Sequence, residues 1–174
     1  YQACANIVDG NTVQAGEHTL TAAHILIAAG SVLAVPPIKG ADLPGVVTSD
    51  ALLEGEGLDC ERLVIIGGGV IGVEMASIYA SLGKQVTIIE AADKILPPMD
   101  REISQNLSMI LKKRGVTIFT SSMVNEISQT DSGLLCHFAD KKGEQTAEAD
   151  VVLISVGRKP CTAGLFADEF HVDM

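Results

Sequence analysis

The sequence lacks the cysteine pattern of secreted disulfide-rich domains and of zinc sites. Its four cysteines are scattered and none forms a C-x-x-C pair; they are Cys4, Cys60, Cys136 and Cys161. We therefore expect no disulfide framework and no metal site, and we expect each cysteine to be a small buried or half-buried residue. A charged-then-apolar secretory leader is also missing from the first residues, so we expect no export by that route.

Long apolar runs and excess positive charge are absent too. The longest apolar stretches, such as residues 63–66 and 151–156, have the length of strands and fall far short of the roughly 20 residues that span a membrane. The net charge of −10 disfavours binding to nucleic acid and to anionic membranes, which require basic surfaces. We expect a soluble cytoplasmic protein. Because the chain opens at Tyr1 without an initiator methionine, we expect either an excised segment or a trimmed mature protein.

The first forty residues contain several residues that favour turns, such as glycine, asparagine and proline. Residues 6–8 and 12–14 flank Asp9-Gly10-Asn11, which is typical of a β-hairpin. Residues 23–29 form an apolar run before Gly30, and we predict a strand there. The proline-rich segment 35–40 follows, and it indicates a domain boundary because proline interrupts both helix and sheet.

Strand and helix patterns then alternate. The apolar run 63–66 predicts a strand covered on both faces, and residues 70–82 predict a helix that is apolar on nearly all sides and therefore buried. Asp100 is a predicted N-cap for a helix over 101–114, with Gly115 as its end. Further predictions are a short helix at 49–53 and an apolar stripe on the second long helix (Ile103, Leu107, Ile110, Leu111). We also predict buried strands at 86–89 and 151–156, a third strand at 116–119, and hairpin strands at 124–128, 134–138 and before Asp150. The pattern predicts a three-layer α/β fold, Rossmann-like, with a parallel sheet and an antiparallel β-meander.

The glycine-rich motif Gly67-Gly68-Gly69-Val70-Ile71-Gly72 lies between the first of these strands and its helix. Gly67 permits a tight turn, Gly69 lets the backbone approach a pyrophosphate, and Gly72 lets the helix pack on the sheet. The free N–H groups at the helix start then face the phosphates. A ligand-free tight turn is the alternative, but the flanking strands and a terminal acid favour a dinucleotide site.

Glu90 ends the next strand, 18 residues after Gly72, close to the roughly 20 residues that the dinucleotide fingerprint places before its acid. Its carboxylate is suited to accept hydrogen bonds from both ribose hydroxyls and would repel a 2′-phosphate. The residues that follow, Ala91, Ala92 and Asp93, carry no positive charge, and the first base is Lys94. We therefore expect NAD rather than NADP.

Glu74 is the only charged residue between Val70 and Leu82. A carboxylate within an apolar helix is costly without a partner, so we expect it to meet a basic group or the nicotinamide end of the cofactor. Stabilisation by the helix dipole is the alternative. The histidines share no spacing with acids or cysteines, and we expect no catalytic role for them: His18, His24, His137 and His171.

Several motifs in this order resemble the flavin-dependent pyridine nucleotide–disulfide oxidoreductases. They are Ala28-Ala29-Gly30, G-G-G-V-I-G-V-E over residues 67–74, V-T-I-I-E ending at Glu90, I-L-P-P-M-D-R-E over 95–102, and V-G-R-K-P over 156–160. The chain is most similar to the dihydrolipoamide dehydrogenase branch, which uses NAD. Cys161 departs from the pattern, because asparagine is more usual after G-R-x-P.

The resemblance implies an order of domains and partners. Residues 1–33 would end a first FAD-domain segment, 34–156 would form the NAD-binding domain, and 157–174 would begin the return to the FAD domain. Glu74 would pair with a flavin-side lysine beside the nicotinamide, and Gly157 and Arg158 would lie where the cofactor domains meet. The implied partners are NAD(H), FAD, the remaining FAD and dimerisation domains, and a 2-oxo acid dehydrogenase complex.

Four family motifs are missing from these 174 residues: the FAD glycine motif, the C-x-x-x-x-C redox pair, the later Gly-Asp flavin motif and the C-terminal His-Glu pair. We therefore expect no catalytic residue and no turnover of dihydrolipoamide by this segment alone. The alternatives within the family are an NADH oxidase, a CoA-disulfide reductase or a mercuric reductase-like enzyme. A stand-alone NAD-binding module without catalysis is the alternative from another class.

Overall fold

A computed structural model describes residues 1–55, 59–170 and 172 of the chain. The chain divides into two compact units. The larger unit is Leu33–Gly157, and the smaller one combines Tyr1–Val32 with Arg158–Met174.

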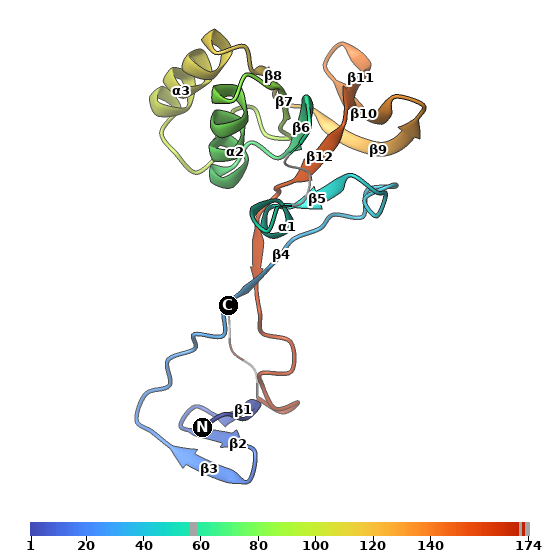
Figure 1. Ribbon diagram of the computed structural model, residues 1–174. Helices are drawn as coiled ribbons and strands as arrows, with labels where there is room; N and C mark the ends of the chain where they lie inside the picture. Colours follow the sequence, from blue (N-terminus) through green and yellow to red (C-terminus); the bar gives the residue numbers. More distant parts are fainter. Residues whose placement is uncertain (56–58, 171, 173–174) are drawn as a thin grey trace. The chain divides into compact units, whose positions relative to one another are not determined.

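A five-stranded parallel sheet forms the middle of the larger unit (Figure 1). Its strands lie in the order β5 (Val46–Thr48), β12 (Val151–Ile154), β6 (Arg62–Ile66), β7 (Gln85–Ile89) and β8 (Thr117–Phe119). The central strand β6 is in register with β12 on one side and β7 on the other. These strands are rich in valine and isoleucine, which fit a pleated surface covered on both faces. The predicted strands are confirmed, although the last of them ends at Ile154 rather than Val156.

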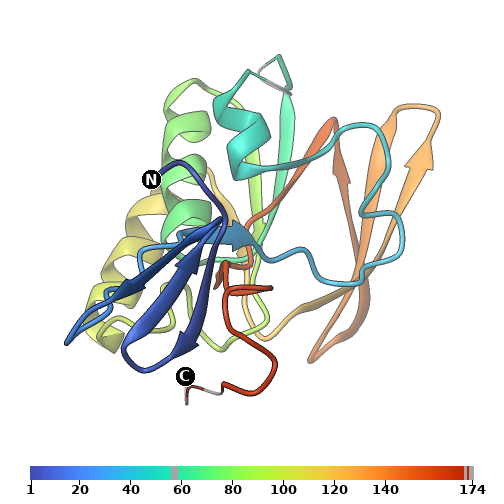
Figure 2. The ribbon, with the colours of Figure 1, turned by 90° about the horizontal axis from the view of Figure 1, so that it is seen from below.

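Two helices, α2 (Val70–Ser81) and α3 (Arg101–Lys113), pack on one face of the sheet (Figures 1 and 2). Leu63 and Ile65 of β6 point toward them and lie in one core with Val73 and Ala76. The short helix α1 (Ser49–Leu53) begins at the N-cap Thr48. The helices predicted over these three segments are confirmed.

An antiparallel meander covers the opposite face of the sheet (Figure 2). It consists of β9 (Met123–Thr130), β10 (Gly133–Asp140) and β11 (Gly143–Ala149), with β10 in the middle. Val64 and Ile66, which alternate with the helix-facing residues of β6, pack in the same core as Phe138 of β10. Because successive residues of a strand point to opposite faces, β6 supplies both cores, and the predicted three-layer α/β fold is confirmed.

The smaller unit is built from short strands. Its antiparallel sheet has the order β1 (Ala5–Asp9), β2 (Thr12–Ala15), β3 (His18–Thr21), and the turn between β1 and β2 confirms the predicted hairpin. Strand β4 (Ser31–Leu33), of which the first two residues belong to this unit, pairs with β13 (Arg158–Pro160). Within this unit, Arg158 donates from Nε to the hydroxyl of Ser31 over 2.7 Å.

The strand predicted at residues 23–29 is wrong. This segment forms no regular element, and Leu26 is 91% exposed. An apolar run becomes a strand only when another strand pairs with its backbone, and no partner strand is present among the described residues. The run alone could not reveal that.

The buried faces of both long helices differ from expectation. Helix α2 is not buried on all sides, because Val70 and Ile78 are about half exposed, at 51% and 49%. On α3, Ile103 and Ile110 are exposed, whereas the smaller Ser104 is buried together with Leu111. Each helix touches the sheet along one side only, and apolar composition does not identify that side.

Two of the four cysteines also differ from expectation, since Cys4 and Cys161 are exposed while Cys60 and Cys136 are buried. Both exposed thiols lie in the smaller unit, whose short strands cover little of their own surface. Among the described residues, no helix is long and apolar enough to cross a membrane.

Candidate functional site

The glycine motif forms the turn from β6 into α2, at the carboxyl edge of the parallel sheet. Gly67 has a φ of +107°, and a Cβ there would overlap the carbonyl oxygen of Ser155. A Cβ on Gly72 would overlap the carbonyl oxygen of Gly67. A Cβ on Gly69 would meet nothing within 4 Å. Two of the glycines are therefore required by packing, whereas Gly69 faces open space.

Helix α2 begins without a side-chain cap. Gly69 is its N-cap, and the carbonyl of Gly69 accepts the first helical hydrogen bond, from Val73 N–H over 3.0 Å. Within the described part of the chain, the N–H groups of Val70 and Ile71 have no acceptor. Unpaired N–H groups at the positive end of a helix dipole are suited to bind an anion.

The carboxylate of Glu90 lies against this turn. Glu90 directly follows β7 and is 9% exposed. Its Oε2 accepts a hydrogen bond from Gly68 N–H over 2.5 Å, and its Oε1 accepts one from Ala92 N–H over 2.7 Å. The structure thus brings together the two parts of the predicted site, the glycine turn and the acid.

A loop after β7 also contacts the turn. Leu96 donates its backbone N–H to the carbonyl oxygen of Gly68 over 2.7 Å. Leu96 has a φ of +49°, which is uncommon for a residue with a side chain, and Ser121 nearby in the fold has a φ of +52°. The N–H of Ser121 donates to the carbonyl oxygen of Ala92, whose own N–H donates to Glu90. Sequence reasoning missed Leu96, because leucine is no signal of a positive φ.

The other predicted site residues lie around the same edge. Val70 is exposed, Ile71 is half-buried against the helix-side core, and Ala91 is exposed directly after Glu90. Gly157 follows β12 and has a φ of +118°. Because β12 and β6 are adjacent, parallel and in register, the chain leaves both strands at the same edge.

Glu74 departs from its prediction in one respect. Its side chain is exposed, so the carboxylate does not sit in apolar surroundings. Within the described residues it forms no ion pair and no hydrogen bond. The cost that argued for a basic partner inside this chain is therefore absent, and a partner on the flavin side stays a prediction.

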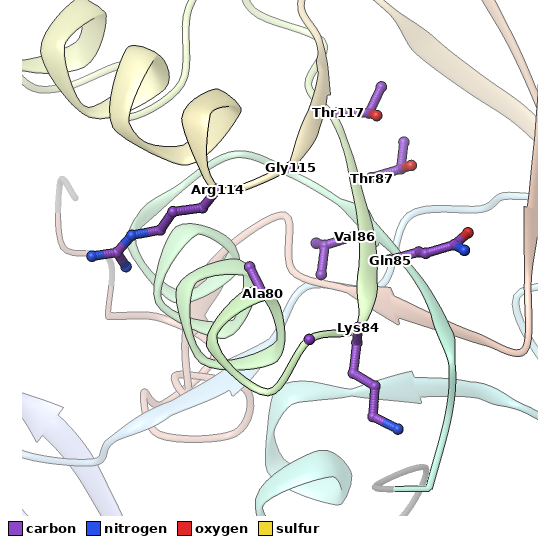
Figure 3. Close-up of a pocket in the computed structure, with 9 residues that line it drawn as sticks. Ala80, Lys84, Gln85, Val86, Thr87, Arg114, Gly115 and Thr117 are labelled. Atoms are coloured by element: carbon purple, nitrogen blue, oxygen red, sulfur yellow. The ribbon is translucent and has the colours of Figure 1, made fainter.

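A depression of about 450 Å³ lies at the opposite edge of the sheet (Figure 3). Its lining includes Gln85 and Thr87 at the start of β7 and Thr117 at the start of β8. Two basic residues, Lys84 and Arg114, lie on its rim, and their side chains point away from each other in Figure 3. Lys84 forms an ion pair with Glu61 over 2.7 Å. The depression contains none of the predicted site residues.

The whole chain, residues 1–174, matches the family model described as pyridine nucleotide-disulphide oxidoreductase. Dihydrolipoamide dehydrogenase of Chaetomium thermophilum is 38% identical over 162 residues, which cover 91% of this chain and 32% of that protein. Dihydrolipoyl dehydrogenase of Acholeplasma laidlawii is 38% identical over 169 residues, covering 95% of this chain and 49% of that protein. The solved structure of the HOCl-induced flavoprotein disulfide reductase RclA from Escherichia coli matches with a TM-score of 0.73 at 36% identity, covering 94% of this chain and 37% of that one.

The chain thus spans about a third to a half of the length of these curated relatives. The resemblance noted in the motifs is confirmed along the full sequence, and the solved structures share the Rossmann-like fold. The chain belongs to the pyridine nucleotide-disulphide oxidoreductases, which are flavin-dependent oxidoreductases that use FAD and NAD(P).

Proposed function

We propose that residues 34–156 form the NAD(H)-binding domain of a flavin-dependent disulfide oxidoreductase of the dihydrolipoamide dehydrogenase type. The observation that carries the proposal is the placement of the Glu90 carboxylate against the glycine turn. The turn offers unpaired N–H groups and the open space at Gly69 to a pyrophosphate, and Glu90 offers carboxylate oxygens to the adjoining ribose. Both groups are located at one edge of the sheet, where such folds bind ligands.

In this proposal the smaller unit is the part of an FAD domain that this chain contains. The two compact units divide within one residue of the boundaries that the family resemblance implies. In the intact enzyme the flavin would pass a hydride to NAD⁺ after a dithiol has reduced the enzyme. The contribution of this chain is to hold the nucleotide in place, because chemistry at a cofactor depends on positioning. A 2-oxo acid dehydrogenase complex stays a predicted partner.

The surroundings of Glu90 support a preference for NAD over NADP. A 2′-phosphate requires nearby positive charge, and the first two bases after Glu90 in the sequence are already engaged. Lys94 donates to the carbonyl oxygen of Met99, and Arg101 pairs with Asp93 over 3.2 Å. A phosphate beside Glu90 would meet a carboxylate and no free base of this loop.

Calorimetric titration of the full chain with NADH and with NADPH tests the proposal. We expect NADH to bind at least about tenfold more tightly than NADPH, which corresponds to roughly 1.4 kcal/mol. Equal or tighter binding of NADPH would overturn the assignment of NAD. If neither NADH nor NADPH binds at millimolar concentration, the assignment of a nucleotide site is overturned.

A further inference from the structure

Both oxygens of the Glu90 carboxylate accept hydrogen bonds from backbone groups of this chain. One oxygen holds the N–H of Gly68 at 2.5 Å and the other holds the N–H of Ala92 at 2.7 Å. Gly68 is also held from its other side, because its carbonyl accepts from Leu96 at 2.7 Å. The middle glycine of the turn is therefore fixed through both of its backbone polar groups.

Packing around Gly68 is equally close. A Cβ on Gly68 would lie 3.0 Å from Cγ2 of Ile95 and 3.2 Å from Cβ of Glu90. Gly68 is buried and Glu90 is 9% exposed. Hydrogen bonds to an ionised group are stronger than neutral ones, and low exposure to water strengthens them further.

The remaining acceptor capacity of Glu90 defines what it can bind. An ionised carboxylate offers about four lone-pair directions. With one N–H on each oxygen, each oxygen keeps about one direction free. That arrangement suits two neighbouring hydroxyl donors, such as the 2′- and 3′-hydroxyls of a ribose.

We propose that Glu90 is a positioning residue for the glycine turn as well as a ribose ligand: its carboxylate holds Gly68 and Ala92 in the binding shape before the nucleotide arrives. The part that concerns nucleotide affinity rests on the function proposed above. Loss of the carboxylate then disorders the pyrophosphate end of the site along with the ribose end. Because a preorganised site binds more tightly, removing the Glu90 carboxylate weakens binding of NADH. For NADPH this loss is opposed by the removal of the charge that repels the 2′-phosphate.

A glutamine at this position distinguishes the two roles. Glutamine has nearly the same shape, but one oxygen becomes an NH₂ group that donates and cannot accept. Whichever way the amide turns, an NH₂ group then faces either Gly68 N–H or Ala92 N–H. Glu90→Gln therefore breaks one of the two holding bonds while leaving the packing of the side chain intact.

The experiment compares the full chain with Glu90→Gln, Glu90→Ala and the control Glu144→Gln, which alters an exposed acid on β11. Amide NMR signals of Gly68 and Ala92 are recorded without nucleotide, and NADH and NADPH are then titrated. We expect Glu90→Gln to move at least one of these two amide proton signals upfield and to speed its hydrogen exchange. We expect NADH to bind about tenfold more weakly or worse, and Glu144→Gln to change neither readout.

Unchanged Gly68 and Ala92 signals in Glu90→Gln would overturn the positioning role. If the alanine variant fails to fold, the nearly isosteric glutamine variant still decides the question. If the unaltered chain binds neither nucleotide, the proposed function fails, while the amide signals recorded without nucleotide still decide whether Glu90 holds the turn.

Discussion

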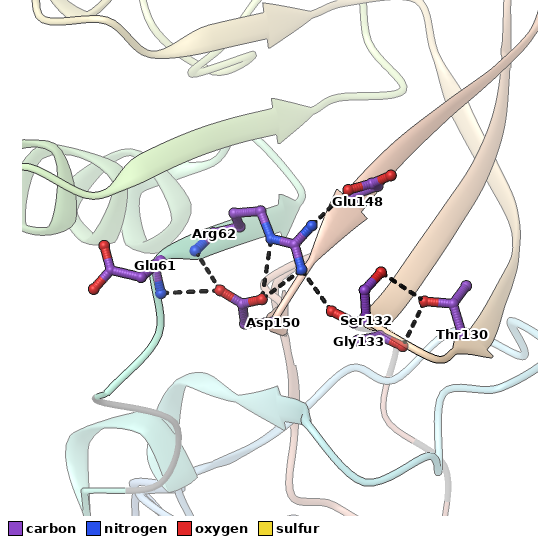
Figure 4. A network of polar contacts seen from close by, with 7 residues as sticks. All are labelled: Glu61, Arg62, Thr130, Ser132, Gly133, Glu148 and Asp150. Carbon is purple, nitrogen blue, oxygen red and sulfur yellow. Dashed lines mark hydrogen bonds and ion pairs between the residues drawn. The ribbon is translucent and has the colours of Figure 1, made fainter.

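Arg62 and Asp150 join the parallel sheet to the meander through a forked ion pair (Figure 4). Arg62 donates from Nε and Nη2 to Oδ1 of Asp150 over 3.0 and 2.6 Å. The second oxygen of Asp150 accepts the backbone N–H groups of Glu61 and Arg62 over 3.0 and 2.8 Å. Arg62 also reaches Glu148 at the end of β11 and the carbonyl of Ser132 in the β9–β10 turn. One arginine at the start of β6 thus connects segments that are far apart in the sequence.

We predict that Asp150→Asn lowers the free energy of unfolding by about 1–2 kcal/mol, a value reduced for partial exposure of the pair. Both oxygens of Asp150 face donors, so an NH₂ group in either place meets another donor. Urea unfolding measures the change. Glu144→Gln, which alters an exposed acid on β11, is the control and should leave the urea midpoint unchanged. Equal midpoints for both variants would contradict the prediction.

The same pair predicts a loss of stability in acid. The hydrogen bond from the Arg62 side chain lowers the pKa of Asp150 below its usual value of 3.8. Because the folded-state pKa is the lower one, the stabilisation is fully present above the unfolded pKa and is lost as the pH falls through the folded pKa. Urea midpoints measured from neutral pH down to pH of about 2 should fall less steeply for Asp150→Asn than for the unaltered chain. Parallel curves would show that Asp150 does not contribute.

Two glycines of the turn should respond to the same substitution in opposite ways. We predict that Gly69→Ala leaves the melting temperature nearly unchanged but weakens NADH binding by about tenfold or more, because the new methyl group enters the open space of the proposed pyrophosphate site. Gly72→Ala should lower the melting temperature, because its Cβ overlaps the Gly67 carbonyl. Thermal unfolding and NADH titration of both variants measure this. An intact NADH affinity in Gly69→Ala would place the phosphates elsewhere.

The thiols should separate into two classes. Burial raises the pKa of Cys136 to about 12, and burial is also the main cause that raises the pKa of Cys60. Since the thiolate is the reactive form, we expect iodoacetamide at mildly alkaline pH to modify Cys4 and Cys161 and to spare the other two in the folded chain. Mass spectrometry of peptides locates the label, and urea-unfolded chain labelled at all four sites is the control. Rapid labelling of Cys136 in the folded chain would contradict its burial.

Short-range patterns in the sequence predicted much of the fold. The β-branched runs of β6 and β7 indicated buried strands, and the predicted N-cap Asp100 accepts a hydrogen bond from Glu102 N–H over 2.8 Å. The glycine spacing placed the turn correctly between strand and helix. These features depend on residues a few positions apart, so local backbone preferences and side-chain chemistry are sufficient to determine them.

Only the tertiary structure decided which surfaces are covered and which polar groups meet. The exposure of Leu26, the burial of Ser104 in place of Ile103, and the contact of Leu96 with Gly68 all depend on partners distant in the sequence. Glu90 shows the division most clearly: its position after a strand predicted a ribose ligand, whereas its bonds to Gly68 and Ala92 arise from the packing of the loop and turn around it. Residue type and spacing determine which chemistry is available, and packing determines where it is used.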